Sequence, residues 1–385
     1  MTPELFAFGS NGSGQLGIGH NEDVSMPEKC IFEDDFSFQN SVSGLSAQPS
    51  NSTVSRIVAG GNHTLVLLND GRVYIAGWGQ PVFKRVFVTD AETGTEHGLF
   101  KGVAATWEAS VVVASAASES QAGCSDVVFV LGSGTKGELG LGAGVTEAQT
   151  NGVRIPNFPP QGVKVRSVAG GMGHVVVICS DGSVYGWGTA RKGQLGSKLA
   201  SEKIVWEPRR IGLEGIGVEF AVSDAVCGRE FTVLCGDKAK GEFVILGPSS
   251  GSPAEKDRWG IRTENPASEG VKGYFGIHAS WHGVYVHRED QSICAWGRND
   301  RGQLPPGDLG KAREVAVGSE HCLALLDDDR GRGVVAFGWG EHGNCGAKTD
   351  TQGNVKGACA WISLPEGVEV VGVGAGCATS WIIVA

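Results

Sequence analysis

The chain has 385 residues, of which 41% are hydrophobic and 61 are glycine, and its net charge is −10. The hydrophobic share excludes wholesale disorder, and the acidic balance argues against a broad nucleic-acid-binding surface, which needs clustered lysine and arginine. Glycine is about twice as frequent as usual without a strict triplet period, which excludes collagen and predicts many tight turns.

The N-terminal residues, MTPELFAFGS, contain neither the basic nor the apolar region of a secretory signal. The sequence contains no apolar run of 18 residues, so no membrane span is predicted. The ten cysteines are scattered along the chain, so we expect them to be reduced thiols. These features together favour a cytoplasmic and nuclear protein.

The stretch FGSNGSGQLG at 8–17 contains the G-x-G-x-x-G pattern of dinucleotide-binding loops, but no amphipathic helix follows it, as that site requires. The stretch instead recurs along the chain, at 131–140, 187–196, 296–304 and 337–346, with shorter copies at 76–80 and 246–250. The leading glycines of these seven first phrases are Gly9, Gly77, Gly132, Gly188, Gly247, Gly297 and Gly338.

A second phrase, VAGGNHTLVL at 58–67, alternates with the first. Its further copies stand at 103–113, 168–178, 226–234, 278–286, 317–325 and 374–384. Because two independent series both number seven, the sequence predicts seven repeats of about 50 residues.

Each second phrase ends in an apolar run, which leads through a turn such as Asn69-Asp70-Gly71 or Ser180-Asp181-Gly182 into another strand. An Asp-Gly pair between two such runs is typical of a β-hairpin. The repeats therefore predict an all-β fold, a seven-bladed β-propeller that forms a single domain over 1–385.

The two ends of the chain carry complementary strands, since it begins with a first-phrase strand and ends with a second-phrase strand. Elsewhere these two strands are hairpin partners. We therefore predict that Glu4–Gly9 pairs with Ser380–Ala385 and closes the propeller, which leaves only short outer edges.

Three insertions interrupt the repeats near 37–53, 114–125 and 248–272, and their small and polar residues predict mobile, solvated loops. A shorter insertion at 327–330 extends one hairpin.

Several motifs that suggest chemistry have simpler structural explanations. Gly247-Pro-Ser-Ser-Gly251 fits the G-x-S-x-G nucleophile elbow, but the sequence that follows is polar and broken by proline. His278, His282 and His287 lie in a strand context, where their spacing does not place them on one face, and no C-x-x-C pair supports zinc. We predict no catalytic residues, no cofactor and no metal site.

Two series of repeated side chains are predicted to be structural. His63, His174 and His321 share one repeat position just before the apolar strand, where a hydrogen-bonding role is expected. A tryptophan stands at or near the leading glycine in four repeats, which predicts packing between blades: Trp78, Trp187, Trp296 and Trp339.

The position just before those histidines varies between repeats and includes two tryptophans and an arginine. Equivalent loops of a propeller share one face, and this composition is typical of protein-binding hot spots. The alternative is that the aromatic rings plug the central channel. With their neighbours, the predicted partner-binding residues are Trp107, Glu108, Arg229, Glu230, His278, Trp281, His282 and Glu320.

The paired phrases resemble the regulator-of-chromosome-condensation repeat, and the resemblance covers nearly the whole chain. Within that family, 8–23, 337–346 and 374–384 look like the fungal killer-toxin-insensitivity propellers. That resemblance implies a non-enzymatic protein that forms a heterodimer with a small metal-binding zinc-ribbon protein. Together the two would support diphthamide synthesis on elongation factor two and Elongator-dependent modification of the tRNA wobble uridine.

Two other functions remain open. The same face could act as a guanine-nucleotide exchange factor for a Ran-like small GTPase, although the chain lacks a basic N-terminal arm for chromatin. A propeller adaptor for ubiquitin ligation is a third option, but no second domain is evident that would recruit an enzyme.

Overall fold

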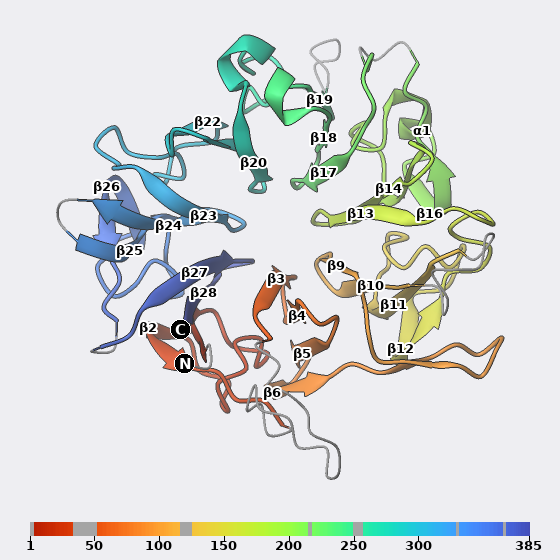
Figure 1. The fold of residues 1–385 in the computed structure, drawn as a ribbon, viewed down its shortest axis with the longest axis horizontal. Helices are drawn as coiled ribbons and strands as arrows, with labels where there is room; N and C mark the ends of the chain where they lie inside the picture. The colour runs from red at the N-terminus through yellow and green to blue at the C-terminus, as the bar shows by residue number, and fades with distance from the viewer. Residues whose placement is uncertain are drawn as a thin grey trace. The chain divides into compact units, whose positions relative to one another are not determined.

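The structure is a computed structural model, and it describes residues 4–33, 52–115, 125–214, 218–248, 257–328, 331–364 and 367–385 (Figure 1). Most of the three predicted insertions, namely 37–51, 116–124 and 249–256, lies outside the described residues. The chain divides into two compact units. Unit 1 comprises Met1–Phe87 and Pro306–Ala385, and unit 2 comprises Val88–Pro305.

Unit 1 contains three antiparallel sheets of four strands each. One has the order β2-β1-β28-β27, and the others run in chain order from β3 to β6 and from β23 to β26. Their bounds are β1 (Glu4–Gly9), β2 (Val24–Lys29), β3 (Val54–Ala59), β4 (His63–Leu68), β5 (Val73–Gly77), β6 (Gln80–Arg85), β23 (Ala312–Val317), β24 (His321–Asp328), β25 (Gly331–Trp339), β26 (Asn354–Trp361), β27 (Val370–Ala375) and β28 (Thr379–Val384).

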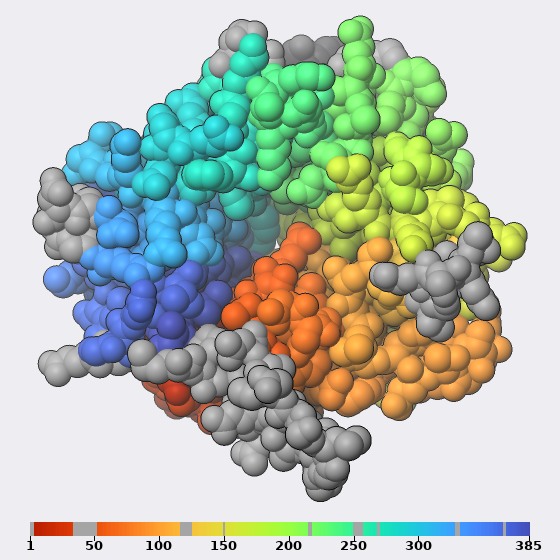
Figure 2. Space-filling view, in the orientation of Figure 1, coloured from red at the N-terminus to blue at the C-terminus, as the bar shows by residue number. Residues whose placement is uncertain are grey.

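Unit 2 contains four larger sheets, which lie side by side in chain order from orange to cyan in Figures 1 and 2. Two have four strands, namely β9 (Gly102–Ala105), β10 (Ala109–Ala114), β11 (Val127–Ser133) and β12 (Glu147–Arg154), then β13 (Val165–Gly170), β14 (His174–Cys179), β15 (Val184–Thr189) and β16 (Ile204–Arg210). Two have three strands, namely β17 (Asp224–Cys227), β18 (Thr232–Cys235) and β19 (Phe243–Leu246), then β20 (Tyr274–Ala279), β21 (Gly283–Arg288) and β22 (Ile293–Gly297).

The smaller elements of unit 2 are the hairpin β7 (Val88–Thr89) and β8 (Glu96–His97), the helix α1 (Ser197–Ala200) and the 3-10 helices η1 (Lys238–Lys240) and η2 (Ser268–Val271). No fourth strand follows β22 in the fully described segment 298–311. That segment contains Pro305 and Pro306, which have no N–H group to donate to a sheet.

Each large sheet contains one second phrase followed by one first phrase, so the described residues form seven blades. The prediction of an all-β, seven-bladed β-propeller is confirmed. The second-phrase strands β4, β10 and β14 are buried at every residue. A strand with both faces covered reads as a continuous apolar run, which is how these segments appear in the sequence.

The predicted pairing of the chain ends is confirmed. β1 pairs with β28 in an antiparallel register that runs from Glu4 opposite Val384 to Gly9 opposite Thr379. Leu5 and Trp381, one from each strand, are buried in the same hydrophobic core. The blade β2-β1-β28-β27 is therefore built from both ends of the described chain.

The glycine-rich first phrase forms a turn that its own side chains hold in place. All seven leading glycines have φ between 90° and 157°. At Gly9, an added Cβ would lie 2.4 Å from the carbonyl oxygen of Ala378, the residue just before β28. The amide oxygen of Gln15 accepts a hydrogen bond from Ser13 N at 2.8 Å. In other blades the equivalent hydrogen bond, from the backbone N–H two residues earlier, is accepted by the side chains of Glu138, Gln194 and Gln303.

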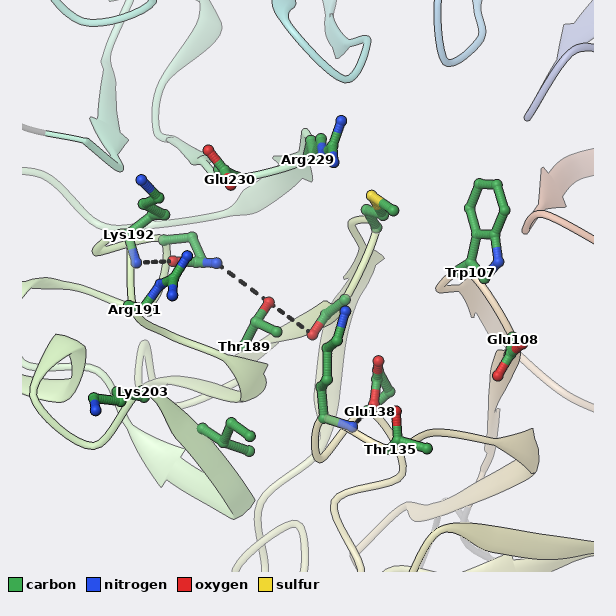
Figure 3. A pocket seen from close by; sticks show the side chains of 15 residues that line it. Trp107, Glu108, Thr135, Glu138, Thr189, Arg191, Lys192, Lys203, Arg229 and Glu230 are labelled. Atoms are coloured by element: carbon green, nitrogen blue, oxygen red, sulfur yellow. Dashed lines mark hydrogen bonds between the residues drawn. The ribbon is translucent and has the colours of Figure 1, made fainter. Parts of the chain in front are cut away.

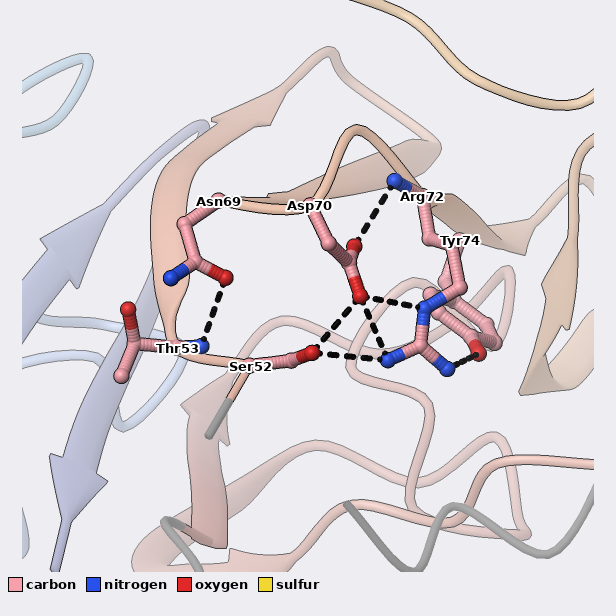
Figure 4. Close-up of polar contacts among 6 residues, drawn as sticks. All are labelled: Ser52, Thr53, Asn69, Asp70, Arg72 and Tyr74. Atoms are coloured by element: carbon pink, nitrogen blue, oxygen red, sulfur yellow. Dashed lines mark hydrogen bonds and ion pairs between the residues drawn. The ribbon is translucent and has the colours of Figure 1, made fainter. Parts of the chain in front are cut away.

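The Asn69-Asp70-Gly71 turn joins β4 to β5 as predicted, with Gly71 at a φ of 89° (Figure 4). The Asp70 carboxylate accepts hydrogen bonds from Arg72 N at 3.0 Å and from Ser52 Oγ at 2.6 Å. Burial of Asp70 is outweighed by these bonds and by the Arg72 guanidinium at 2.7 Å, which together lower the pKa of Asp70. This network fixes Ser52, where the described chain resumes before β3, to the hairpin.

In unit 2, the fully buried His174 of β14 links neighbouring blades. Its Nε2 lies 2.9 Å from Oγ1 of Thr232 on β18, and that hydroxyl donates to the Gln194 carbonyl oxygen at 2.8 Å. The imidazole therefore donates through Nε2 and is neutral, and burial lowers the pKa of His174 to about 4.

In unit 1, His321 of β24 repeats this arrangement. Its Nε2 lies 2.9 Å from Oγ of Ser380 on β28, and that hydroxyl donates to the Asn344 carbonyl oxygen at 2.8 Å. Burial lowers the pKa of His321 to about 4. His63 is also buried, with its ring stacked on Trp78 at a centroid distance of 4.4 Å. The predicted structural role of these histidines is confirmed.

The four repeated tryptophans fall into two classes. Trp187 is fully buried, and its indole donates to the Glu138 carbonyl oxygen of the preceding blade at 2.8 Å. Trp296 is also buried. Both stand just before the leading glycine, whereas Trp78 and Trp339 follow it. Trp78 lies in the turn after β5 and is 36% exposed, and Trp339 is the half-buried last residue of β25. Packing between blades is therefore the role of the first pair only.

Candidate partner-binding site

The second-phrase loops of unit 2 are linked to one another by backbone hydrogen bonds. Trp107 N donates to the Met172 carbonyl oxygen at 3.0 Å, and Met172 N donates to Gly228 O at 3.4 Å. Arg229 N donates to the Trp281 carbonyl oxygen at 3.0 Å. These bonds join the loops of four consecutive blades into one rim, which is the arrangement expected of equivalent propeller loops.

Three of the predicted partner-binding side chains form a cluster on this rim. The ring centroids of Trp107 and Trp281 lie 5.7 Å apart, and the guanidinium carbon of Arg229 lies 5.8 Å from the Trp281 ring centroid. Trp107 is 38% exposed and Arg229 is exposed, so the cluster presents both an aromatic surface and a positive charge to solvent. We call these three residues the aromatic cluster.

Two predicted glutamates flank the aromatic cluster. Glu108 and Glu230 are half-buried, and both line the same cleft as Trp107 and Arg229. The Glu108 carboxylate accepts a hydrogen bond from Ser133 Oγ at 3.1 Å.

The remaining three predicted residues are placed differently. His278 belongs to strand β20 rather than to a loop, and it is half-buried. The His282 ring lies 6.0 Å from the ring of Trp259. Glu320 is in unit 1 and only 4% exposed, so its side chain offers little surface.

The cleft in unit 2 has a volume of about 710 Å³ and a mixed lining in which cations outnumber carboxylates (Figure 3). Its size is that of ordinary ligand pockets. The charged lining residues are the cations Lys136, Arg191, Lys192, Lys203 and Arg229 and the carboxylates Glu108, Glu138 and Glu230. The cleft thus carries an excess of positive charge on a protein whose net charge is −10.

Sequence reasoning missed the contribution of the first phrase to this cleft. Lys136 lies in the turn after β11, Arg191 and Lys192 lie in the turn after β15, and Lys203 stands just before β16. The available signal was the run of basic residues in TKGELG and RKGQLG, at the variable positions of two neighbouring repeats.

One wall of the cleft is held by hydrogen bonds that Figure 3 marks. The Gln194 amide accepts from Lys192 N at 2.9 Å and donates to Thr189 Oγ1 at 3.2 Å. The Thr189 hydroxyl donates to the Gly173 carbonyl oxygen at 3.0 Å. The loop that carries Arg191 and Lys192 is therefore fixed to the second-phrase loop beside it.

Glu138 occupies the position that is glutamine in the best-preserved repeats, and the residue is 8% exposed. It accepts a hydrogen bond from Lys136 N at 2.6 Å. Burial, with a smaller effect of the Glu108 charge, raises the pKa of Glu138. A raised folded-state pKa means that the ionised carboxylate opposes folding at neutral pH, and this opposition fades as the pH falls.

We therefore expect Glu138→Gln to raise the free energy of unfolding at pH 7 by up to about 1 kcal/mol, because an amide keeps the acceptor and removes the buried charge. Denaturant unfolding at pH 7 and pH 4 measures this, and the gain should shrink at the lower pH. Glu147→Gln, at an exposed carboxylate of unit 2, is the control and should change little. A loss of stability in Glu138→Gln would contradict the expectation.

The described residues contain no group of three or more His, Cys, Asp or Glu side chains placed to hold a metal ion. His278, His282 and His287 do not form one. Within the same residues, no helix is long and apolar enough to cross a membrane.

Comparisons with known proteins agree with the repeat pattern. The model of the regulator of chromosome condensation (RCC1) repeat matches residues 4–67 and 181–235. An RCC1 repeat-containing protein of Schizosaccharomyces pombe is 28% identical over 99% of this chain and 98% of its own length. A secretion-regulating guanine nucleotide exchange factor of Mus musculus is 25% identical over 97% of this chain and 82% of its own.

Among solved structures, that of Prp20p from Saccharomyces cerevisiae aligns with a TM-score of 0.68 and 17% identity over 100% of this chain and 92% of its own. This likeness concerns the fold. The family-model match and the full-length relatives show that the chain is similar to RCC1 repeat proteins, and its fold is a seven-bladed β-propeller.

Proposed function

We propose that this protein is a non-enzymatic binding platform, and that its partner docks on the second-phrase loops of unit 2. The observation that supports this most directly is the aromatic cluster of Trp107, Trp281 and Arg229 beside a charged cleft. Tryptophan and arginine dominate the residues whose truncation weakens protein interfaces most, and such residues lie close together in well-packed patches.

We further propose that the partner is a small metal-binding zinc-ribbon protein, with which the chain forms a heterodimer in the cytoplasm and nucleus. In this role the pair supports diphthamide synthesis on elongation factor two and Elongator-dependent modification of the tRNA wobble uridine. The proposal is supported by the likeness of 8–23, 337–346 and 374–384 to the fungal killer-toxin-insensitivity propellers.

The first test of the platform is the double variant Trp107→Ala/Trp281→Ala. It should weaken partner affinity by about tenfold or more while leaving the fold intact, because an exposed cluster contributes more to binding than to the core. Titration calorimetry with the purified partner measures the affinity, and circular dichroism checks the fold. Phe275→Ala, at another exposed aromatic residue of unit 2, is the control. Unchanged affinity in a folded double variant would remove the cluster from the interface.

A second candidate function is guanine-nucleotide exchange on a Ran-like small GTPase. The observation that favours it is the similarity to a secretion-regulating guanine nucleotide exchange factor over 97% of this chain. Such a factor would bind the nucleotide-free GTPase through the same loops.

Affinity purification of the tagged chain from its own cells distinguishes the two. Co-elution of a protein below about 100 residues with four cysteines supports the zinc-ribbon partner, since that is the size range of metal-dependent small domains. A bound GTPase that guanine nucleotide releases would support the exchange factor and overturn the heterodimer.

A further inference from the structure

The cleft of unit 2 contains cations that the protein itself does not neutralise. Within the described part of the chain, Lys136, Arg191, Lys203 and Arg229 are exposed and make no ion pair with a carboxylate. The guanidinium of Arg229 lies over the ring of Trp281. Exposed cations gathered around one concavity attract an anionic ligand, and the low dielectric of its walls focuses their field.

Two of the three carboxylates of the cleft also accept hydrogen bonds from within the protein. Glu138 is buried and accepts a hydrogen bond from Lys136 N, and Glu108 accepts one from Ser133 Oγ. The five cations of the lining outnumber its three carboxylates, so a ligand in the cleft meets an excess of positive charge.

From this geometry we propose that the cleft binds an acidic polypeptide segment of the partner, whose carboxylates pair with Lys136, Arg191, Lys203 and Arg229 and whose apolar residue packs on Trp107. The proposal rests on the platform function and adds the chemistry of what the platform holds. Figure 3 shows Arg191, Lys192 and Lys203 on one side of the cleft and Trp107 on the other. A segment between them would meet cations along one side and an aromatic ring along the other.

A peptide fits this lining better than a nucleic acid does. Glu108 and Glu230 border the cleft and would repel a continuous phosphate backbone, whereas a peptide can place amides or cations beside them.

The experiment uses the full chain and three fluorescein-labelled probes: a Leu-flanked run of six glutamates, the same peptide with glutamine, and a single-stranded RNA of similar length. Fluorescence anisotropy in low and moderate salt should show binding of the glutamate peptide, weakened by salt, and much weaker binding of the glutamine peptide. Arg191→Glu/Lys203→Glu should weaken binding of the glutamate peptide about tenfold or more, because each reversal replaces attraction by repulsion.

The matched control is Lys164→Glu/Arg166→Glu, which makes the same change in net charge at exposed residues of unit 2 outside the cleft. It should bind the glutamate peptide nearly as the unchanged protein does. The proposal is overturned if the glutamate peptide does not bind, if both charge-reversal variants behave alike, or if the RNA binds more tightly than the peptide.

The same variants separate this inference from the platform function. Trp107→Ala/Trp281→Ala could weaken partner binding while Arg191→Glu/Lys203→Glu leaves it unchanged. That result would overturn the proposed acidic segment but not the platform function. If neither double variant changes the partner's affinity, both the proposed interface and the acidic segment of the partner are overturned, even where the free peptide still binds in the cleft.

Discussion

Gly9→Ala is expected to lower the free energy of unfolding by about 3 kcal/mol or more, the largest effect we expect from a single methyl group. Gly9 has a φ of 116°, where an L-residue is strained by about 1–2 kcal/mol. The added Cβ would also lie 2.4 Å from the Ala378 carbonyl oxygen and 2.9 Å from the Asn344 Cβ. Ala378 directly precedes β28, so relieving the contact with its carbonyl oxygen would move β1 and β28 relative to each other.

Gly12→Ala is the matched control, three residues further along the same turn. Its φ is not in the left-handed region, and nothing lies within 4 Å of the added Cβ. We expect a change within about 0.5 kcal/mol. Denaturant unfolding of both variants measures the difference in their free energies of unfolding. Equal destabilisation by the two would show that the effect of a side chain does not depend on its position in the turn. That result would refute the close-approach explanation of the leading glycine.

Acidification from pH 7 to pH 4.5 is expected to destabilise the protein through His174 and His321. Burial lowers the pKa of each to about 4 in the folded protein, whereas an unfolded histidine titrates near 6.5. Between those values the unfolded chain binds more protons, so the free energy of unfolding falls as the pH falls. The slope approaches about 1.4 kcal/mol per pH unit for each histidine.

Unfolding of His174→Gln/His321→Gln measured over the same pH range tests this directly. The double variant should be less stable at pH 7, because the bonds to Thr232 and Ser380 are altered, but it should lose less stability on acidification. His20→Gln, at an exposed histidine, is the control and should keep the slope of the unchanged protein. A double variant with an undiminished slope would mean that other groups cause the acid sensitivity.

The fold could be predicted because its determinants are local and repeated. The leading glycines need positive φ, the Asn-Asp-Gly turn needs Gly71 beyond Asp70, and the buried central strands need continuous apolar runs. Each requirement restricts the residue type at one position of the repeat, so the same pattern recurs along the sequence. Even the pairing of β1 with β28 could be predicted, because a first-phrase strand at one end of the chain lacks the second-phrase strand that stands at the other end.

The candidate site could be predicted only in part, because it depends on how loops of different blades meet. The repeat position indicated Trp107, Arg229 and Trp281, and the structure places these together. Nothing in the alignment of repeats shows that the turn with Arg191 faces the same cleft as the loop with Trp107. That relation depends on the packing between blades, which no single repeat encodes.

The blade β2-β1-β28-β27 also constrains the order in which the protein can fold during synthesis. β1 is translated before the other strands of the described chain, and its partner β28 is translated after them. Until then β1 exposes one unpaired edge, and the loop that its pairing closes spans nearly every other blade. Contacts of such high sequence separation form slowly and leave the nascent chain open to aggregation. The edge of β1 that later pairs with β28 therefore stays open to wrong pairing until β28 has been translated.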